Sequence, residues 1–336
     1  MPIRSQPLAE VGVEARRPTL VNGQWTRGSV AASSITNDLG QARLFGLPPG
    51  EYFLSAYSTA VATWRGPENA VITYFPGSLA AQEATRIAVA AVQETAVTMP
   101  LLGQELLKTV SASAAIPTAP AGTARIRGRV VTAETNRGLA GAAVRIVGGG
   151  LRLPRIVLTG PDGRYEIDSV PPGRYTLSAT KPGYAVQDYG QGGAAGFVDL
   201  VNDQTVDEVS LALEKGGVIV VRVTDESGEP LIDVTVGPEH YQATRDGRRL
   251  VPVLPAPDYP RTDDRGEVRL FGLPQGDYSI RARPGGLVPI TPTMAASQGR
   301  SYVPTYFPGT SAPERAQSVA VQTGREIDVS LPLLLR

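Results

Sequence analysis

The chain contains a single histidine and no cysteine, which limits the chemistry that its side chains could perform. A zinc peptidase in its usual forms needs at least two imidazole ligands, whereas His240 stands alone in GPEHYQATRDG (237–247). A serine hydrolase would also have to use His240, and the G-x-S-x-G turn that presents such a serine is absent. We therefore predict that the chain is not an enzyme and that His240 is a solvent-facing loop residue.

Acidic residues gather at two turns, DDRGE (263–267) and NDLG (37–40), which raises the question of calcium. The D-x-[DN]-x-[DN]-G spacing of the calcium-binding loop is absent from both. Asp and Asn side chains also close turns by accepting hydrogen bonds from nearby backbone amides. Structural turns are the favoured interpretation, with a weak calcium site as the alternative, and we predict no cofactor.

Aromatic residues supply the candidate contacts with a ligand or partner. Tyr-Phe-Pro-Gly occurs at 74–77 and again at 306–309, each time after a variable loop. Aromatic side chains beside variable loops can form a binding surface. They can equally plug the open end of a β-sandwich by packing. The candidate contact residues are Trp64, Tyr74, Phe75, Tyr189, Tyr306 and Phe307.

These residues belong to a chain that repeats itself. The segment LFGLPPGEYFLSA (44–56) returns as LFGLPQGDYSIRA (270–282) and, in weaker form, as IDSVPPGRYTLSA (167–179). A sequence with this property is built from tandem copies of one structural unit. The repeated residues are typical of turns and cores, so they indicate the architecture more strongly than the function.

Each copy predicts a hairpin, in which two adjacent antiparallel strands with matched inward faces are joined by a tight turn. Apolar residues alternate with polar ones on both sides of a Pro-x-Gly triplet, in which Pro presets φ and Gly supplies a positive φ. Flanking segments bring the total to about seven short strands in roughly 90–120 residues, which is typical of a β-sandwich. Short helical turns are expected only around 79–86 and 311–317.

The first copy lacks its opening strand. PLAEV (7–11) matches PLIDV (230–234), but only six residues precede Pro7, whereas the opening strand of the third copy begins thirteen residues before Pro230. We expect the chain to be a fragment; a misassigned start, or another element in that place, are the alternatives. The open strand edge is a candidate site of self-association.

Composition divides the chain into three domains. The segment 111–124, SASAAIPTAPAGTA, is rich in Ala, Pro, Ser and Thr and has no hydrophobic periodicity, which is typical of a linker. The junction near Lys215 is very short, which predicts close contact between the second and third domains and a looser tether for the first. The predicted boundaries are a first domain at 1–103, a linker at 104–124, a second domain at 125–214 and a third at 215–336.

The pattern resembles the carboxypeptidase regulatory-like domain. The resemblance is carried by RGRVVTAETNRGLAGAAV (127–144), LTGPDGRYEIDSVPPGRYTLSATKPGY (158–184), VRVTDESGEPLIDVTV (221–236) and RTDDRGEVRLFGLPQGDYSIRA (261–282). It implies a seven-stranded, transthyretin-like (Greek-key, Ig-like) β-sandwich, related to the B-type repeats of bacterial collagen adhesins. The predicted fold class is therefore all-β, with three tandem sandwiches of which the first lacks its opening strand.

The relation to adhesin repeats raises the question of an internal Lys–Asn isopeptide bond. Such a bond needs a lysine on the opening strand and an asparagine on the closing strand. The only lysines are Lys108, Lys181 and Lys215, none on a predicted opening strand, and the predicted closing strands contain no asparagine. We predict that the bond is absent.

Charge and hydropathy exclude several classes of function. Thirty-two basic residues balance thirty-two acidic ones, which argues against a nucleic-acid partner. No stretch of 18 apolar residues predicts a membrane helix, and the first residues lack the apolar region of a signal peptide. We expect a non-catalytic, extracytoplasmic binding or spacer module of a bacterial secreted or surface protein, with a periplasmic, secreted or cell-surface location.

The alternatives are a carbohydrate-binding accessory protein, or a fragment of a larger enzyme or outer-membrane transporter that carries such domains. The expected partner is an unidentified protein or a glycan.

Overall fold

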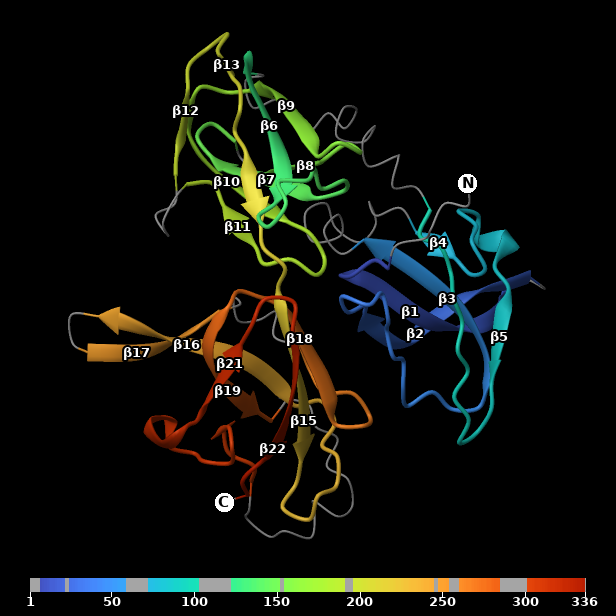
Figure 1. Ribbon diagram of the computed structural model, residues 1–336. Helices are drawn as coiled ribbons and strands as arrows, with labels where there is room; N and C mark the ends of the chain where they lie inside the picture. Colours follow the sequence, from blue (N-terminus) through green and yellow to red (C-terminus); the bar gives the residue numbers. More distant parts are fainter. Residues whose placement is uncertain are drawn as a thin grey trace.

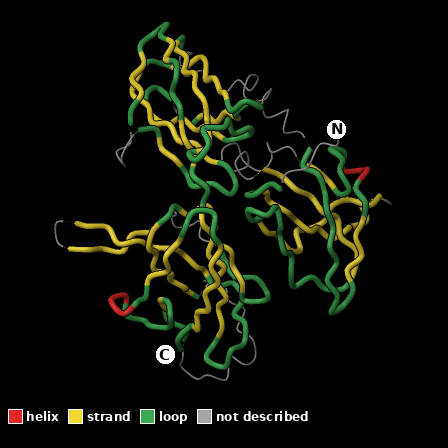
Figure 2. The backbone as a smooth tube through the Cα atoms, viewed as in Figure 1, coloured by secondary structure: helices red, strands yellow, loops and turns green. Residues whose placement is uncertain are grey.

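The computed structural model describes residues 7–21, 24–58, 72–102, 122–151, 154–190, 196–244, 247–253, 260–284 and 301–335. These residues form three β-rich units, coloured along the chain in Figure 1. We call them unit 1 (7–102), unit 2 (122–214) and unit 3 (215–335). Strands dominate each unit in Figure 2, and the expected helical turns are short 3-10 helices at Ala81–Glu83 and Pro313–Arg315.

Unit 3 contains two sheets. The first has the order β17 (Gly247–Pro252), β16 (Thr235–Thr244), β19 (Gly276–Arg283) and β20 (Thr305–Tyr306), with β21 (Ser318–Val321) paired to β19. The second has the order β18 (Glu267–Leu273), β15 (Gly217–Thr224) and β22 (Glu326–Pro332). The opening strand β15 thus occupies the centre of its sheet, antiparallel to β18 and parallel to β22.

Unit 2 repeats this plan. Its first sheet has the order β11 (Gln187–Asp188), β10 (Gly173–Thr180), β7 (Ala143–Gly148) and β8 (Arg155–Leu158), with β12 (Val198–Leu200) paired to β10. Its second sheet is built on the opening strand β6 (Ala124–Thr132), which pairs with β9 (Arg164–Val170), β13 (Thr205–Val206) and β14 (Leu211–Leu213). Because β6 begins at Ala124, the last residue of the predicted linker already belongs to the strand.

The cores follow from the period-two alternation of the sequence. In unit 3 the inward residues of β15 are Ile219, Val221 and Val223, all fully buried. They face the inward residues of β19, among them Ile280 and Ala282, within one apolar cluster. Successive side chains of a strand point to opposite faces, so one alternating strand from each sheet suffices to form this layer.

Unit 1 has one sheet where units 2 and 3 have two. Its strands have the order β2 (Gln24–Ile35), β1 (Val11–Val21), β3 (Gly50–Ser58) and β4 (Thr73–Tyr74), with β5 (Arg86–Val89) paired to β3. The counterparts of β18 and β22, residues 41–47 and 94–102, form no strand. Their common partner in unit 3 is β15, and the described residues of unit 1 include no strand in the corresponding place.

Units 2 and 3 are joined directly through the backbone. Tyr184 of unit 2 and Lys215 form an isolated antiparallel bridge, and the amide of Gly216 donates to the carbonyl of Gly183 at 3.0 Å. The short junction therefore fixes the two units against each other, as its length predicted.

Candidate functional site

The repeated Pro-x-Gly-x-Tyr motif is a structural device. Each tyrosine is almost fully buried, and its hydroxyl donates to the carbonyl of the proline four residues earlier, across the turn. These bonds join Tyr52 to Pro48 (2.5 Å), Tyr175 to Pro171 (2.7 Å) and Tyr278 to Pro274 (2.7 Å). The ring fills the core while the hydroxyl holds the turn, which explains why the motif recurs without any chemistry of its own.

The acidic turns use their side chains for backbone hydrogen bonds. Asp263 Oδ1 accepts from the amides two and four residues later, at 2.9 and 3.0 Å. Asn37 Oδ1 accepts the equivalent two bonds, both at 3.0 Å. Structural turns therefore account for these residues. Within the described ranges, no group of three or more His, Cys, Asp or Glu side chains could hold a metal ion.

The aromatic candidates of units 1 and 3 lie at equivalent places. Tyr74 is only 5% exposed, and Phe75 packs against the small core of unit 1. Phe307 packs in the same way against the core of unit 3, while Tyr306 lies 6.0 Å from the guanidinium of Arg281. The packing alternative thus accounts for at least three of these four side chains.

The remaining aromatic candidates belong to other places. Tyr189 packs against the core of unit 2. Trp64 lies outside the described residues. The structure therefore distributes the five described candidates over three units and does not bring them together into one site. Contact between these residues and a ligand stays a prediction.

His240 lies in strand β16, opposite Val251 of β17, and not in the loop that its sequence context suggested. Its neighbour Glu239 is 3% exposed and forms an ion pair with Arg281 at 2.7 Å. Burial raises the pKa of the Glu239 carboxyl, and the positive charge of Arg281 opposes that shift. Sequence patterns missed this pair because its two members lie on different strands.

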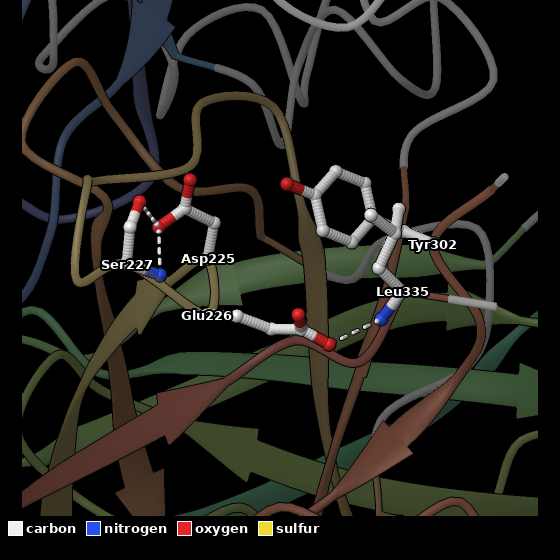
Figure 3. Close-up of a pocket in the computed structure, with 5 residues that line it drawn as sticks. All are labelled: Asp225, Glu226, Ser227, Tyr302 and Leu335. Atoms are coloured by element: carbon white, nitrogen blue, oxygen red, sulfur yellow. Dashed lines mark hydrogen bonds between the residues drawn. The ribbon is translucent and has the colours of Figure 1, made fainter. Parts of the chain in front are cut away.

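A pocket of about 230 Å³ is lined by Asp225, Glu226, Ser227, Tyr302 and Leu335 (Figure 3). Asp225 accepts hydrogen bonds from the backbone amide and the hydroxyl of Ser227, at 2.8 and 2.7 Å. Although desolvation opposes it, these bonds lower the pKa of Asp225. Its carboxylate therefore closes the turn after β15 and is already engaged within the protein.

The most extensive set of polar contacts lies where unit 1 meets unit 3. Arg269 of β18 donates two hydrogen bonds to the carboxylate of Asp38, at 2.6 and 3.1 Å. Arg43 donates two to the carboxylate of Asp264, at 2.5 and 2.9 Å. Both pairs have the bidentate geometry that makes arginine–carboxylate contacts strong and specific. The sequence predicted that the first domain is only loosely tethered to the others. That prediction is wrong, because unit 1 forms direct hydrogen bonds with unit 3.

The two pairs are related by the sequence repeat. Asp38 and Asp264 both stand two residues before the turn glycine, and Arg43 and Arg269 both stand three residues after it. Each unit therefore offers its aspartate to the arginine of the other, as in a two-fold symmetric contact between identical subunits. The contact between units 1 and 3 is therefore formed by the same turn motif from each unit.

Each arginine also pairs with a glutamate of its own unit. Arg43 contacts Glu94 at 2.8 Å, and Arg269 contacts Glu326 at 2.7 Å. Hydrogen bonds from the Arg43 guanidinium lower the pKa of both Asp264 and Glu94. Arg265 adds a further contact to Glu94 at 2.8 Å. The result is two clusters of alternating charges across the interface, one formed by Asp38, Arg269 and Glu326 and one by Asp264, Arg43, Glu94 and Arg265.

Unit 2 lacks the residues for this contact. Pro161 and Glu166 stand at the positions of the aspartate and the arginine, and Glu166 pairs with Arg125 and Arg127 of its own unit. The sequence did contain the signal: D-x-G-x-x-R occurs in the first and third copies and not in the second. Only the fold shows that the two motifs face each other.

The solved structures that this chain matches are remote. The Bacillus anthracis TIE protein is 12% identical with a TM-score of 0.25; the alignment covers 97% of this chain and 52% of that protein, so the chain spans about half its length. GBS52, the minor pilin of Streptococcus agalactiae, is 13% identical with a TM-score of 0.29, over 63% of this chain and 95% of that one. A streptococcal ancillary pilin is 14% identical with a TM-score of 0.27, over 96% and 94%.

The family comparison gives a definite result for unit 2. No curated protein matches the sequence. The family description that does match is the carboxypeptidase regulatory-like domain, over residues 125–213. That range coincides with unit 2, from the beginning of β6 to the end of β14. The similarity to the carboxypeptidase regulatory-like domain therefore extends over the whole of unit 2.

Proposed function

We propose that this chain is a non-catalytic structural module of an extracytoplasmic bacterial protein, which holds β-sandwich units in a fixed mutual arrangement. The observation that carries this proposal is the reciprocal pairing of Asp38 with Arg269 and of Asp264 with Arg43. Together with the backbone junction between units 2 and 3, it ties each unit to a neighbour through specific contacts.

The distribution of polar residues supports a structural role. The recurrent tyrosine, Asp263 and Asn37 are used in turns, and the acidic and basic side chains at the unit boundary are used in ion pairs. No helix in the part of the chain that the structure describes is long and apolar enough to span a membrane.

The arrangement can be tested by small-angle X-ray scattering of the full chain. Asp38→Lys combined with Asp264→Lys places a cation opposite each interface arginine, so we expect unit 1 to detach and the radius of gyration to rise. Asp199→Lys is the matched control, because Asp199 forms a bidentate pair with Arg174 inside unit 2, at 2.8 and 3.0 Å. An unchanged scattering curve for the double variant would contradict the scaffold function.

A binding function is a separate question. The carbohydrate-binding alternative predicts exposed aromatic platforms, whereas Tyr74, Phe75, Tyr189 and Phe307 are buried or packed against their own cores. A glycan array probed with the full chain tests this alternative. Binding that Trp64→Ala abolishes would favour it over a purely structural role.

A further inference from the structure

The contact between units 1 and 3 is made by two faces that are nearly alike. The unit 3 face consists of four charged residues near the beginning of β18 and of β22, namely Asp264, Arg265, Arg269 and Glu326. The equivalent positions of the sequence repeat form the unit 1 face, which consists of Asp38, Leu39, Arg43 and Glu94. The two faces share an aspartate, an arginine and a glutamate, and they differ only at the position of Arg265.

Each face carries both halves of the contact that joins it to the other. Asp38 accepts two hydrogen bonds from Arg269. Arg43 in turn donates two hydrogen bonds to Asp264. A face that bears both members of such a reciprocal pair is complementary to a second copy of itself, as in the two-fold interface of a homodimer. Two copies of the unit 3 face can therefore pair so that Asp264 of each copy meets Arg269 of the other.

The one position that differs favours the pairing of unit 3 with itself. Arg265 pairs with Glu94 of unit 1 at 2.8 Å, and the same carboxylate also accepts from Arg43. The counterpart of Arg265 in unit 1 is Leu39, which has no charge to offer to Glu326. The contact between units 1 and 3 therefore contains this ion pair once. In a symmetric pair of unit 3 faces, Arg265 of each copy meets Glu326 of the other, so the ion pair forms twice.

The central pairs of the contact are partly withdrawn from water. The side chain of Asp38 is 9% exposed and that of Arg269 is 16% exposed. Bidentate pairs of arginine with a carboxylate are geometrically specific, and like charges placed opposite each other repel. The unit 3 face therefore selects its partner by the order of charges along it, and its own order is one that it accepts.

Unit 2 is attached away from the turn that begins the unit 3 face. Gly216, at the junction, packs against the backbone of Gly272 near the end of β18. The turn with Asp264 and Arg265 lies at the other end of β18, and Figure 1 shows unit 2 beyond the junction end. The junction therefore leaves this turn accessible to a partner.

Unit 1 competes for the unit 3 face within the same chain. A covalently linked partner acts at an effective concentration on the order of 1 mM, which a second copy at micromolar concentration does not reach. The full chain should therefore be a monomer, in which the contact with unit 1 covers the unit 3 face.

We propose that the unit 3 face is a self-recognition surface, whose partner is the unit 3 face of a second copy of this chain. Unit 1 occupies this surface in the monomer, and a second copy takes its place when unit 1 is released. The proposal rests on the scaffold function, because the contact that fixes unit 1 is the one that covers the surface.

The test compares the full chain with a release variant, Asp38→Lys combined with Arg43→Ala, by sedimentation velocity. The first change places a cation opposite Arg269, and the second removes the partner of Asp264. Unit 1 should leave the unit 3 face, which is itself unchanged. We expect the full chain to sediment as a monomer and the release variant to form a dimer with rising concentration, below about 1 mM.

Two further substitutions in the unit 3 face give matched controls. Asp264→Lys added to the release variant sets two cations against each other across the two-fold axis, so this triple variant should stay monomeric. Arg265→Leu added to the release variant gives unit 3 the residue that unit 1 has at this position. It should raise the dissociation constant of the dimer about threefold or more, because two exposed ion pairs are lost.

Three results would overturn the proposal. The first is a release variant that stays monomeric at about 1 mM, the effective concentration of the linked partner. The second is a triple variant that dimerises as well as the release variant does, because the dimer would then use another surface. The third is a full chain that dimerises and a release variant that does not, because unit 1 of one copy would then occupy unit 3 of the other.

Small-angle X-ray scattering of the same variants separates this proposal from the scaffold function. A release variant whose monomer has a larger radius of gyration than the full chain, and which does not dimerise, overturns the self-recognition surface and leaves the scaffold function in place. A release variant that is monomeric with an unchanged radius of gyration contradicts both.

Discussion

At the scale of single residues, the recurrent tyrosine combines two contributions to stability. The ring of Tyr278 lies in the core of unit 3, and its hydroxyl donates to Pro274. Burial raises the pKa of this hydroxyl above its ordinary value. The same arrangement in all three units explains why the motif survives where the surrounding sequence has diverged.

Substitution of this tyrosine should separate the two contributions. Tyr278→Phe removes only the hydrogen bond, so we expect a loss of about 1 kcal/mol in the free energy of unfolding. Tyr278→Ala also empties a core position and should cost roughly 3–5 kcal/mol. Denaturant titration of the full chain, followed on the transition of unit 3, measures both values.

Trp64→Ala provides the comparison, because the sequence places Trp64 in an exposed loop. Its expected cost is about 1 kcal/mol or less. Equal losses for Tyr278→Ala and Trp64→Ala would show that the assignment of buried and exposed aromatic residues is wrong.

At the scale of elements, the central position of the opening strand makes its loss costly. β15 pairs with two neighbours at once, whereas the described residues of unit 1 include no such strand and show neither 41–47 nor 94–102 in a ladder. An edge strand missing from the other sheet would affect only one neighbour. Unit 1 should accordingly be the least stable of the three units.

Hydrogen exchange tests this expectation directly. The amides of 41–47 should exchange at least about a hundredfold faster than those of β18 in unit 3, because they have no strand to pair with. The internal reference is the exchange rate of the amides of β1 compared with that of the amides of β16, because each of these strands is paired on both sides in its sheet. Similar protection of 41–47 and β18 would mean that another segment of the chain already pairs with 41–47.

At the scale of the whole molecule, unit 1 is held to unit 3 by charge as well as by the chain. The composition of 111–124 predicts that elastase cuts there first, between Ser111 and Gly122. We expect the fragments 1–110 and 125–336 to stay associated after this cut at low salt. In about 1 M salt they should separate on size-exclusion chromatography, because the exposed part of the network is screened.

Acid should also separate the two fragments of the cleaved protein. The pKa of Asp264 is lowered by its hydrogen bonds to Arg43, so its contribution is fully present above the ordinary Asp pKa of about 3.9 and is lost as the pH falls through the lowered value. The fragments should therefore remain together from pH 5 to 8 and separate only when the pH falls well below the ordinary Asp pKa. Separation at neutral pH and low salt would contradict the role assigned to the Asp–Arg pairs.

Local patterns in the sequence determined much of this protein. Alternation and Pro-x-Gly turns predicted the strands on both sides of the turns at Tyr175 and Tyr278. These features depend on residues close together in the chain, where periodicity and turn chemistry act directly. The short helical turns were predictable for the same reason. The prediction that the strands on both sides of each turn pair as hairpins is wrong, because β9 and β18 pair with the opening strands of one sheet while β10 and β19 belong to the other sheet.

Only the tertiary structure decided which distant residues meet. Asp38 and Arg269 lie 231 residues apart, and nothing local to either specifies the other, although both belong to a recognisable motif. Likewise, Arg43 meets Glu94, which lies 51 residues away, and no local pattern specifies that contact. The sequence determined the strands, turns and repeats of each unit, because these depend on neighbouring residues; the packing of the units determined which charged side chains meet.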